Sequence, residues 1–334
     1  MDSVLAVQRG MAVHTGTPRP PVGLTPHAVV HVQDKLQVRY YAPAKPSGPP
    51  VVLVPSLINK AWILDLEPDR SLVASLAAMG HPTYLVDWGE PCAEDANEDV
   101  GYVVLELLNR AVDRICRHAR APKCVLFGYC MGGTLAGMLA AVRPKRIAAL
   151  ALLNAPFRFA QAGRFRDFVQ RFDVERAIDE DGLVPVEVMQ PAFKMLDPVG
   201  NWTKYKAIEQ ASHEPDRLAR VMARERWLEE NVPMTGAFAR EFITMGYQQD
   251  RLLEGTWSLN GELVDLERIQ APTLVVACEN DFVSPAPACL AVSERIVHAE
   301  VRLLPIGHIG VVVGGFGPKV FYPLLSAWIR EATA

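Results

Sequence analysis

The turn between an apolar strand and a helix at residues 125–134 constrains the fold of this chain more than any other segment. An apolar run leads into Gly128-x-Cys130-x-Gly132, and a helical segment that begins with small residues follows. This pattern is typical of a nucleophile elbow, with cysteine in the position that serine usually occupies. The backbone of such a turn is tight and strained, so the residues that flank the nucleophile must be small. Gly128 and Gly132 meet that requirement.

Cys130 would lie at the N-terminus of the following helix. The partial positive charge of a helix N-terminus favours a thiolate, which is the reactive form of cysteine. A Gly-x-Cys-x-Gly string also arises by chance, and many single cysteines are simply small buried apolar residues. The strand before Cys130 and the helix after it are the context that the motif requires. The sequence therefore predicts a nucleophilic cysteine, provided that an acid and a histidine follow.

Both partners follow in the expected places. Asp281 comes after an apolar strand, and His308 lies in a loop of small residues after a strand expected at 300–304. The order nucleophile, acid, histidine is the one that this fold uses. Glu279 is the alternative acid, although a residue at that position usually lies on the face of the strand. We therefore predict that Cys130, Asp281 and His308 act together as a catalytic triad.

The chain also offers backbone donors for an oxyanion hole. In this fold one N–H comes from the residue after the nucleophile, here Met131, and the other from the loop that follows an earlier strand. The apolar run at residues 51–54 is that strand, and both Leu57 and Ile58 are candidates for the second donor. The sequence leaves the choice between Leu57 and Ile58 open.

Short apolar runs alternate with helical patterns on both sides of the elbow, which predicts a mostly parallel central sheet covered by helices. Together with the elbow, this rhythm predicts the α/β-hydrolase fold. Residues 1–24 are polar and rich in proline and are expected to form a flexible lead-in. Residues 25–153 and 271–334 would form the α/β core. The helical, charge-rich segment at 154–270 would be a cap inserted over the C-terminal edge of the sheet, where open α/β sheets bind ligands.

The overall composition narrows the function further. A net charge of −4 gives no sign of a nucleic-acid partner. The six cysteines have no paired short spacing, so neither a zinc site nor a disulfide framework is indicated, and no cofactor is expected. No apolar run approaches the length of a membrane span, and the N-terminus lacks the pattern of a secretory signal. A reducing cytoplasm is the expected location, and it suits a free catalytic thiol.

With these residues in view, the chain resembles the polyhydroxyalkanoate synthases, most closely the short catalytic subunit of the two-component class III type. The resemblance runs from about Val22 to the C-terminus. Four segments carry it. Residues 55–60 and 63–66 are similar to the family's Pro-Pro-x-Ile-Asn-Lys and Ile-Leu-Asp-Leu blocks, and the second segment is the cysteine elbow. Residues 281–285 are similar in part to Asp-His-x-Val-Pro, and Gly307-His308-Ile309 matches Gly-His-Ile. Phe282 stands where the family usually has histidine, and Ser56 where it has proline.

The resemblance implies a specific activity and specific partners. It implies that (R)-3-hydroxyacyl-CoA is polymerised onto a growing polyester chain with release of CoA, through an acyl group carried by Cys130. It implies a homodimer and, since the long N-terminal domain of the single-component synthases is lacking, a PhaE-type second subunit. It also implies a location at the surface of polyester granules. The family leaves two roles open for Asp281, which either orients His308 or activates the attacking hydroxyl.

Two other classes of function remain open from the sequence. The first is a hydrolase with a cysteine elbow, such as an acyl-CoA thioesterase, a dienelactone-hydrolase-like enzyme or a polyester depolymerase, in which water takes the acyl group. The second is a non-catalytic scaffold on granules, against which the intact Cys130, Asp281 and His308 argue. Formation of polymer from a hydroxyacyl-CoA would distinguish a synthase from a hydrolase. Loss of polymer in a Cys130 variant would distinguish a synthase from a scaffold.

Overall fold

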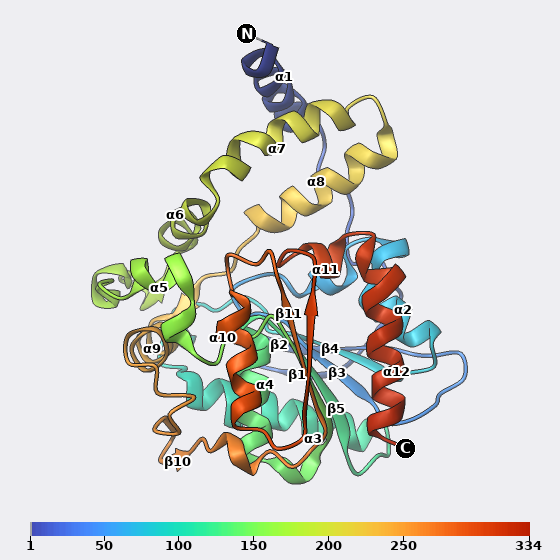
Figure 1. Cartoon of the computed structure of the whole chain (residues 1–334), viewed down its shortest axis with the longest axis vertical. Coiled ribbons are helices and arrows are strands. Elements are labelled where there is room, and N and C mark those ends of the chain that lie inside the picture. Colours follow the sequence, from blue (N-terminus) through green and yellow to red (C-terminus); the bar gives the residue numbers. More distant parts are fainter. Residues whose placement is uncertain (1) are drawn as a thin grey trace.

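A computed structural model describes residues 2–334, and its centre is an eight-stranded sheet in the order β1-β2-β4-β3-β5-β6-β11-β12 (Figure 1). The strands are β1 (Ala28–Gln33), β2 (Leu36–Tyr41), β3 (Val51–Val54), β4 (Thr83–Asp87), β5 (Cys124–Tyr129), β6 (Ile147–Leu153), β11 (Thr273–Cys278) and β12 (Ala299–Leu304). The hairpin β1–β2 and the pair β2–β4 are antiparallel, and all other neighbours in this sheet are parallel. The predicted fold class, an α/β-hydrolase fold with a mostly parallel sheet, is confirmed.

Helices bury both faces of this sheet. Helices α3 (Asn109–His118) and α4 (Met131–Val142) cover one face, and α2 (Leu72–Ala78) and α12 (Tyr322–Ala332) cover the other. Successive side chains of a strand point to opposite faces. Accordingly, Val52 and Val54 of β3 pack in the core beside α3 and α4, while Val51 and Leu53 pack in the core beside α2 and α12. This explains why the buried strands read as continuous apolar runs.

The segment between β6 and β11 is mainly helical. It contains α5 (Gly163–Val169), α6 (Val186–Leu196), α7 (Pro198–Ala211), α8 (Pro215–Glu229) and α9 (Gly236–Glu241), with the short pairs β7 (Leu183–Val184)–β8 (Met234–Thr235) and β9 (Ser258–Leu259)–β10 (Glu262–Leu263). Helices α7 and α8 project from the body of the molecule at the top of Figure 1. The helices thus lie within the segment expected to form the cap, and the domain limits given above remain predictions.

The N-terminal segment differs from the expected flexible lead-in. Asp2–Gly16 form helix α1, which packs along α7 (Figure 1). A Cβ atom at Gly10 would lie 1.8 Å from the carbonyl oxygen of Tyr205, so only glycine allows this approach. Arg9 forms an ion pair with Glu209 at 3.0 Å. The expectation is wrong for Asp2–Gly16 because the helix is stabilised by a partner about 200 positions away, which no local pattern reveals.

The block at residues 63–66 proves to be structural. The buried carboxylate of Asp65 accepts hydrogen bonds from the Thr25 backbone N–H at 3.2 Å and from the Ser71 hydroxyl at 2.6 Å. The Ser71 oxygen in turn accepts from the Ala74 N–H at 3.0 Å and so caps α2. Burial raises the pKa of Asp65. Asp65 therefore joins the segment before β1 to the start of α2.

None of the helices in residues 2–334 combines the length and the apolar character needed to cross a bilayer.

Candidate active site

The elbow has the strained backbone that its sequence predicts. Cys130 follows β5 directly and precedes α4, and its φ of 55° and ψ of −132° lie in a region that residues with a side chain rarely adopt. Its backbone N–H donates to the carbonyl oxygen of Leu153 at the end of β6, at 2.9 Å. The neighbouring strand thus holds the strained turn in place, and the sulfur is presented at the C-terminal edge of the sheet.

The two elbow glycines are required by close backbone contacts. A Cβ atom at Gly128 would lie 2.3 Å from the Cα of Gly133, and one at Gly132 would lie 2.2 Å from the carbonyl oxygen of Val54. Both distances are too short for any real contact, so the turn admits no larger residue. The contact of Gly132 also places the start of α4 against the end of β3.

We expect Gly132→Ala to destabilise the protein by about 3 kcal/mol, because the added methyl group forces two backbone segments apart. Denaturation in urea measures this change. Gly315→Ala is the control, since a Cβ atom there meets nothing within 4 Å. A Gly132→Ala variant as stable as the control would contradict this account of the elbow.

Asp281 and His308 meet at the same edge of the sheet. Asp281 follows β11, and its Oδ2 lies 2.6 Å from Nδ1 of His308, in the loop after β12. The other oxygen, Oδ1, accepts hydrogen bonds from the backbone N–H groups of Val283 at 2.9 Å and Ser284 at 2.8 Å. The Asp281 side chain is fully buried, and 9% of the His308 side chain is exposed. The carboxylate is therefore fixed from both sides and sets the orientation of the imidazole ring.

Cys130 completes this chain of polar contacts. Cys130 lies near enough to His308 to raise its pKa, and since Nδ1 of His308 faces Asp281, Nε2 is the ring nitrogen left for the sulfur. Burial by itself lowers the pKa of His308, but the negative charges of Asp281 and Cys130 and the hydrogen bonds to both raise it to about 10. A protonated imidazole next to a thiolate is the activated form of a cysteine nucleophile. The geometry thus brings together all three residues that the sequence places in the triad, and their catalytic roles remain predictions.

Two residues that the sequence analysis misses hold the His308 loop. The Tyr129 hydroxyl donates to the carbonyl oxygen of His308 at 3.1 Å, and the two rings lie 5.2 Å apart between centroids. The Asn154 side-chain amide donates to the same oxygen at 3.3 Å. Each residue comes at the end of a strand, β5 and β6, and a polar residue at that edge is the signal that could have found them.

Glu279 and Phe282, which lie near Asp281 in the sequence, are outside the cluster of Cys130, His308 and Asp281. Glu279, the alternative acid, is exposed to solvent. Phe282, which replaces the family's histidine, is 49% exposed, whereas Asp281 beside it is buried. The Asp281–His308 contact is thus present in a chain that carries a half-exposed Phe282 at this position.

The candidate oxyanion donors lie beside the elbow. Leu57 and Ile58 form a turn after β3, and Gly132, which follows Met131 at the start of α4, lies against the carbonyl oxygens of Val54 and Pro55 just before this turn. Ile58 is buried, and its carbonyl oxygen accepts from the Val232 N–H at 2.9 Å. The assignment of Met131 and of Leu57 or Ile58 as donors stays a prediction.

Among residues 2–334 the structure contains no group of three or more His, Cys, Asp or Glu side chains arranged to hold a metal ion.

Comparisons with known proteins agree with the fold described above. Residues 49–314 match the family model of the alpha/beta hydrolase fold, and residues 19–76 match that of the poly-beta-hydroxybutyrate polymerase (PhaC) N-terminus. A thermophilic esterase from Thermogutta terrifontis shares the fold with a TM-score of 0.54 at 15% identity, over 92% of this chain and 100% of its own.

Two curated relatives carry the name poly(3-hydroxyalkanoate) polymerase subunit PhaC. The one from Haloferax mediterranei is 31% identical over 93% of this chain and 65% of its own length. The one from Synechocystis is 29% identical over 93% of this chain and 85% of its own length. The chain therefore belongs to the α/β-hydrolase fold family and, within it, to the polyhydroxyalkanoate synthases, with the PhaC subunits as its relatives.

Proposed function

We propose that this chain is the catalytic subunit of a poly(3-hydroxyalkanoate) synthase, an acyltransferase that polymerises (R)-3-hydroxyacyl-CoA and releases CoA. The observation that carries the proposal is the Cys130–His308–Asp281 cluster on a strained elbow, in a chain whose relatives are named as polymerase subunits. A cysteine suits this reaction because exchange between two thioesters is nearly thermoneutral, so the acyl group stays activated after it leaves CoA. We also propose that the chemistry needs no bound cofactor beyond this substrate.

The first step would be acylation of the enzyme. The Cys130 thiolate attacks the thioester carbonyl carbon while His308 holds the proton. The oxygen of the tetrahedral intermediate would accept hydrogen bonds from the Met131 N–H and from that of Leu57 or Ile58. When the intermediate collapses, the bond to the CoA sulfur breaks and the proton on His308 passes to that sulfur. The products are acyl-Cys130 and free CoA.

The second step would be chain extension. The hydroxyl group of another 3-hydroxyacyl unit attacks the acyl-Cys130 carbonyl, and its proton passes to neutral His308 as the new ester bond forms. Cys130 leaves as a thiolate and restores the ion pair. Both oxygens of Asp281 are already occupied, one by two backbone N–H groups and one by His308. This supports a role for Asp281 in orienting His308 over direct activation of the hydroxyl group.

We extend the proposal to the setting of the reaction. A PhaE-type second subunit is proposed because the relatives are named as polymerase subunits. A homodimer and a location at the surface of polyester granules in the cytoplasm are proposed from the family resemblance. The growing product is an insoluble polyester, so the enzyme that extends it is expected to stay at its surface.

Incubation of the purified chain with 3-hydroxybutyryl-CoA, alone and together with a co-expressed second subunit, tests this function. We expect CoA release coupled to insoluble polymer, and a higher rate with the second subunit. Free 3-hydroxybutyrate without polymer would instead identify a hydrolase. Unchanged polymer formation in cells that carry Cys130→Ala would identify a scaffold.

A further inference from the structure

The loop with the candidate oxyanion donors is held in place by the segment between β6 and β11. The carbonyl oxygen of Lys60 accepts a hydrogen bond from Nε1 of Trp227 at 3.0 Å, and that of Ile58 accepts from the Val232 N–H at 2.9 Å. Asn59 forms an isolated antiparallel bridge with Asn231. Residues 58–60 are therefore bound to the end of α8 and to the residues that follow it.

These contacts restrict the direction of the candidate donors. A peptide unit is planar, so a hydrogen bond to a carbonyl oxygen also fixes the N–H of the next residue. The carbonyl oxygen of Pro55 accepts from Nε1 of Trp88 at 2.9 Å, which anchors the loop at its other end. The N–H groups of Leu57 and Ile58 thus lie between two anchored peptide planes. Preorganised donors of this kind are what an oxyanion hole requires.

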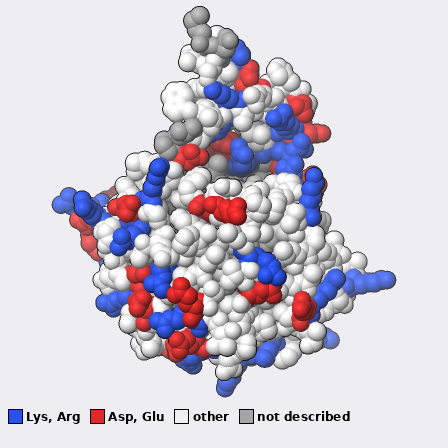
Figure 2. Space-filling model, viewed as in Figure 1, with Lys and Arg blue, Asp and Glu red and all other residues white. Residues whose placement is uncertain are grey.

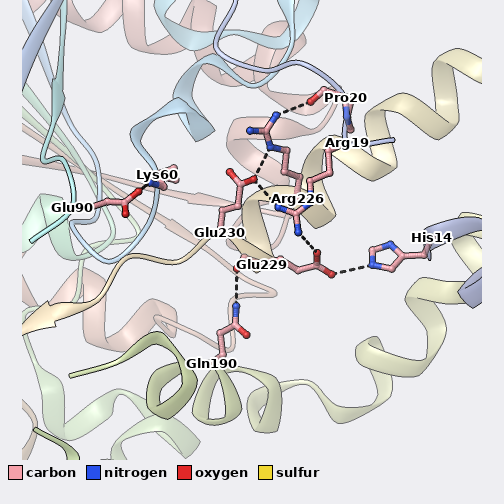
Figure 3. A network of polar contacts seen from close by, with 9 residues as sticks. All are labelled: His14, Arg19, Pro20, Lys60, Glu90, Gln190, Arg226, Glu229 and Glu230. Atoms are coloured by element: carbon pink, nitrogen blue, oxygen red, sulfur yellow. Dashed lines mark hydrogen bonds and ion pairs between the residues drawn. The ribbon is translucent and has the colours of Figure 1, made fainter. Parts of the chain in front are cut away.

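The last turn of α8 is itself held from several directions (Figure 3). Nη1 of Arg226 donates to the carbonyl oxygen of Pro20 at 2.9 Å, and its Nε donates to Glu230 at 2.8 Å. Arg19 also pairs with Glu230, at 3.1 Å. Acidic and basic side chains accordingly lie next to one another on the upper projecting part of the molecule in Figure 2. The N-terminal segment therefore fixes the position of Trp227 through its neighbours.

The geometry points to Trp227 as a positioning residue for the oxyanion loop, an inference that rests on the proposed function. Its indole is buried, with 5% of its surface exposed, and its Nε1–H donates to the loop rather than to substrate. The hydrogen bond from Trp227 holds residues 57–60 in the position from which a backbone N–H meets the developing oxyanion. Through α8, the N-terminal segment and the projecting helices act on the same loop.

The test compares two reactions of the same sulfur. Acylation of Cys130 by 3-hydroxybutyryl-CoA forms an oxyanion, whereas alkylation by iodoacetamide forms none. We expect Trp227→Phe to slow acylation about fivefold to tenfold, as loss of one hydrogen bond allows, and to leave KM and the alkylation rate unchanged. Both rates are measured in a Cys92→Ala background, because Cys92 is an exposed thiol.

Trp202→Phe is the matched control. Trp202 lies on α7 with 65% of its surface exposed, so the same change of side chain should alter neither rate. If Trp227→Phe does not fold, benzothienylalanine placed at position 227 by amber suppression replaces the N–H by sulfur in nearly the same shape.

Each outcome of the test decides a different point. Equal acylation rates in the wild type and the Trp227 variant would overturn the positioning role. So would a parallel loss of acylation and alkylation, since this would show general damage to the site. A wild-type protein that the thioester does not acylate would overturn the proposed function, and the positioning role with it.

Discussion

Cys130→Ala is expected to lower the rate of CoA release by about 10⁴-fold or more, the size of effect seen when a catalytic nucleophile is removed. The sulfur lies on the strained elbow and interacts with His308, and no other thiol occupies an equivalent place in the described part of the chain. The four cysteines that are buried have no access to substrate: Cys116, Cys124, Cys278 and Cys289. Spectrophotometric detection of free CoA thiol measures the rate.

Cys92→Ala is the matched control for this prediction. Cys92 is a free and exposed thiol. If CoA were released by nonspecific attack of any accessible thiol on the thioester, the rate would depend on Cys92. We expect this variant to release CoA at the wild-type rate. A Cys130→Ala protein that keeps more than a small fraction of wild-type activity would show that the acyl group is carried elsewhere.

Asp281→Asn is expected to lower CoA release by about 10³-fold and to change its pH dependence. The wild-type carboxylate lies 2.6 Å from Nδ1 of His308 and helps to raise the pKa of His308 to about 10. Wild-type His308 is therefore protonated at neutral pH and loses its proton only near pH 10. Without the charge of Asp281, less opposes the effect of burial, so the pKa of His308 falls and the protonated ring is less populated at neutral pH.

The rate of alkylation by iodoacetamide as a function of pH measures this change. We expect a nearly constant rate across neutral pH in the wild type, and in Asp281→Asn a low rate at neutral pH that rises only in alkaline solution. Glu279→Gln removes an exposed carboxylate two positions away and should keep the wild-type profile. Matching profiles for Asp281→Asn and the wild type would refute the electrostatic role of Asp281.

The sequence predicts the elbow and the triad because both depend on short-range rules. Gly128 and Gly132 are recognisable since a tight turn leaves no room for a side chain, and their backbone contacts bear this out. Asp281 and His308 each follow a strand, and the ends of parallel strands meet at one edge of a sheet. The sequence alone therefore predicts that Asp281 and His308 lie near Cys130. Only the structure shows that the carboxylate in contact with the His308 ring is that of Asp281.

The remaining features depend on contacts between distant parts of the chain. Helix α1 is stabilised by α7, and no periodic pattern within residues 1–24 shows that Gly10 meets Tyr205. Trp227 reads as an ordinary core residue of a helix, and only its contact with the carbonyl oxygen of Lys60 connects it with the site. Such pairings follow from tertiary packing, which a single sequence does not encode in any local form.

Mass spectrometry of the acid-quenched protein shows whether Cys130 carries the acyl group, as the proposed mechanism requires. The enzyme is mixed briefly with 3-hydroxybutyryl-CoA, quenched, digested and mapped. We expect a 3-hydroxybutyryl group on the peptide that contains Cys130, removable by neutral hydroxylamine and absent from Cys130→Ala. An acyl group on another residue, or CoA release with no acylated peptide in either protein, would rule out Cys130 as the carrier.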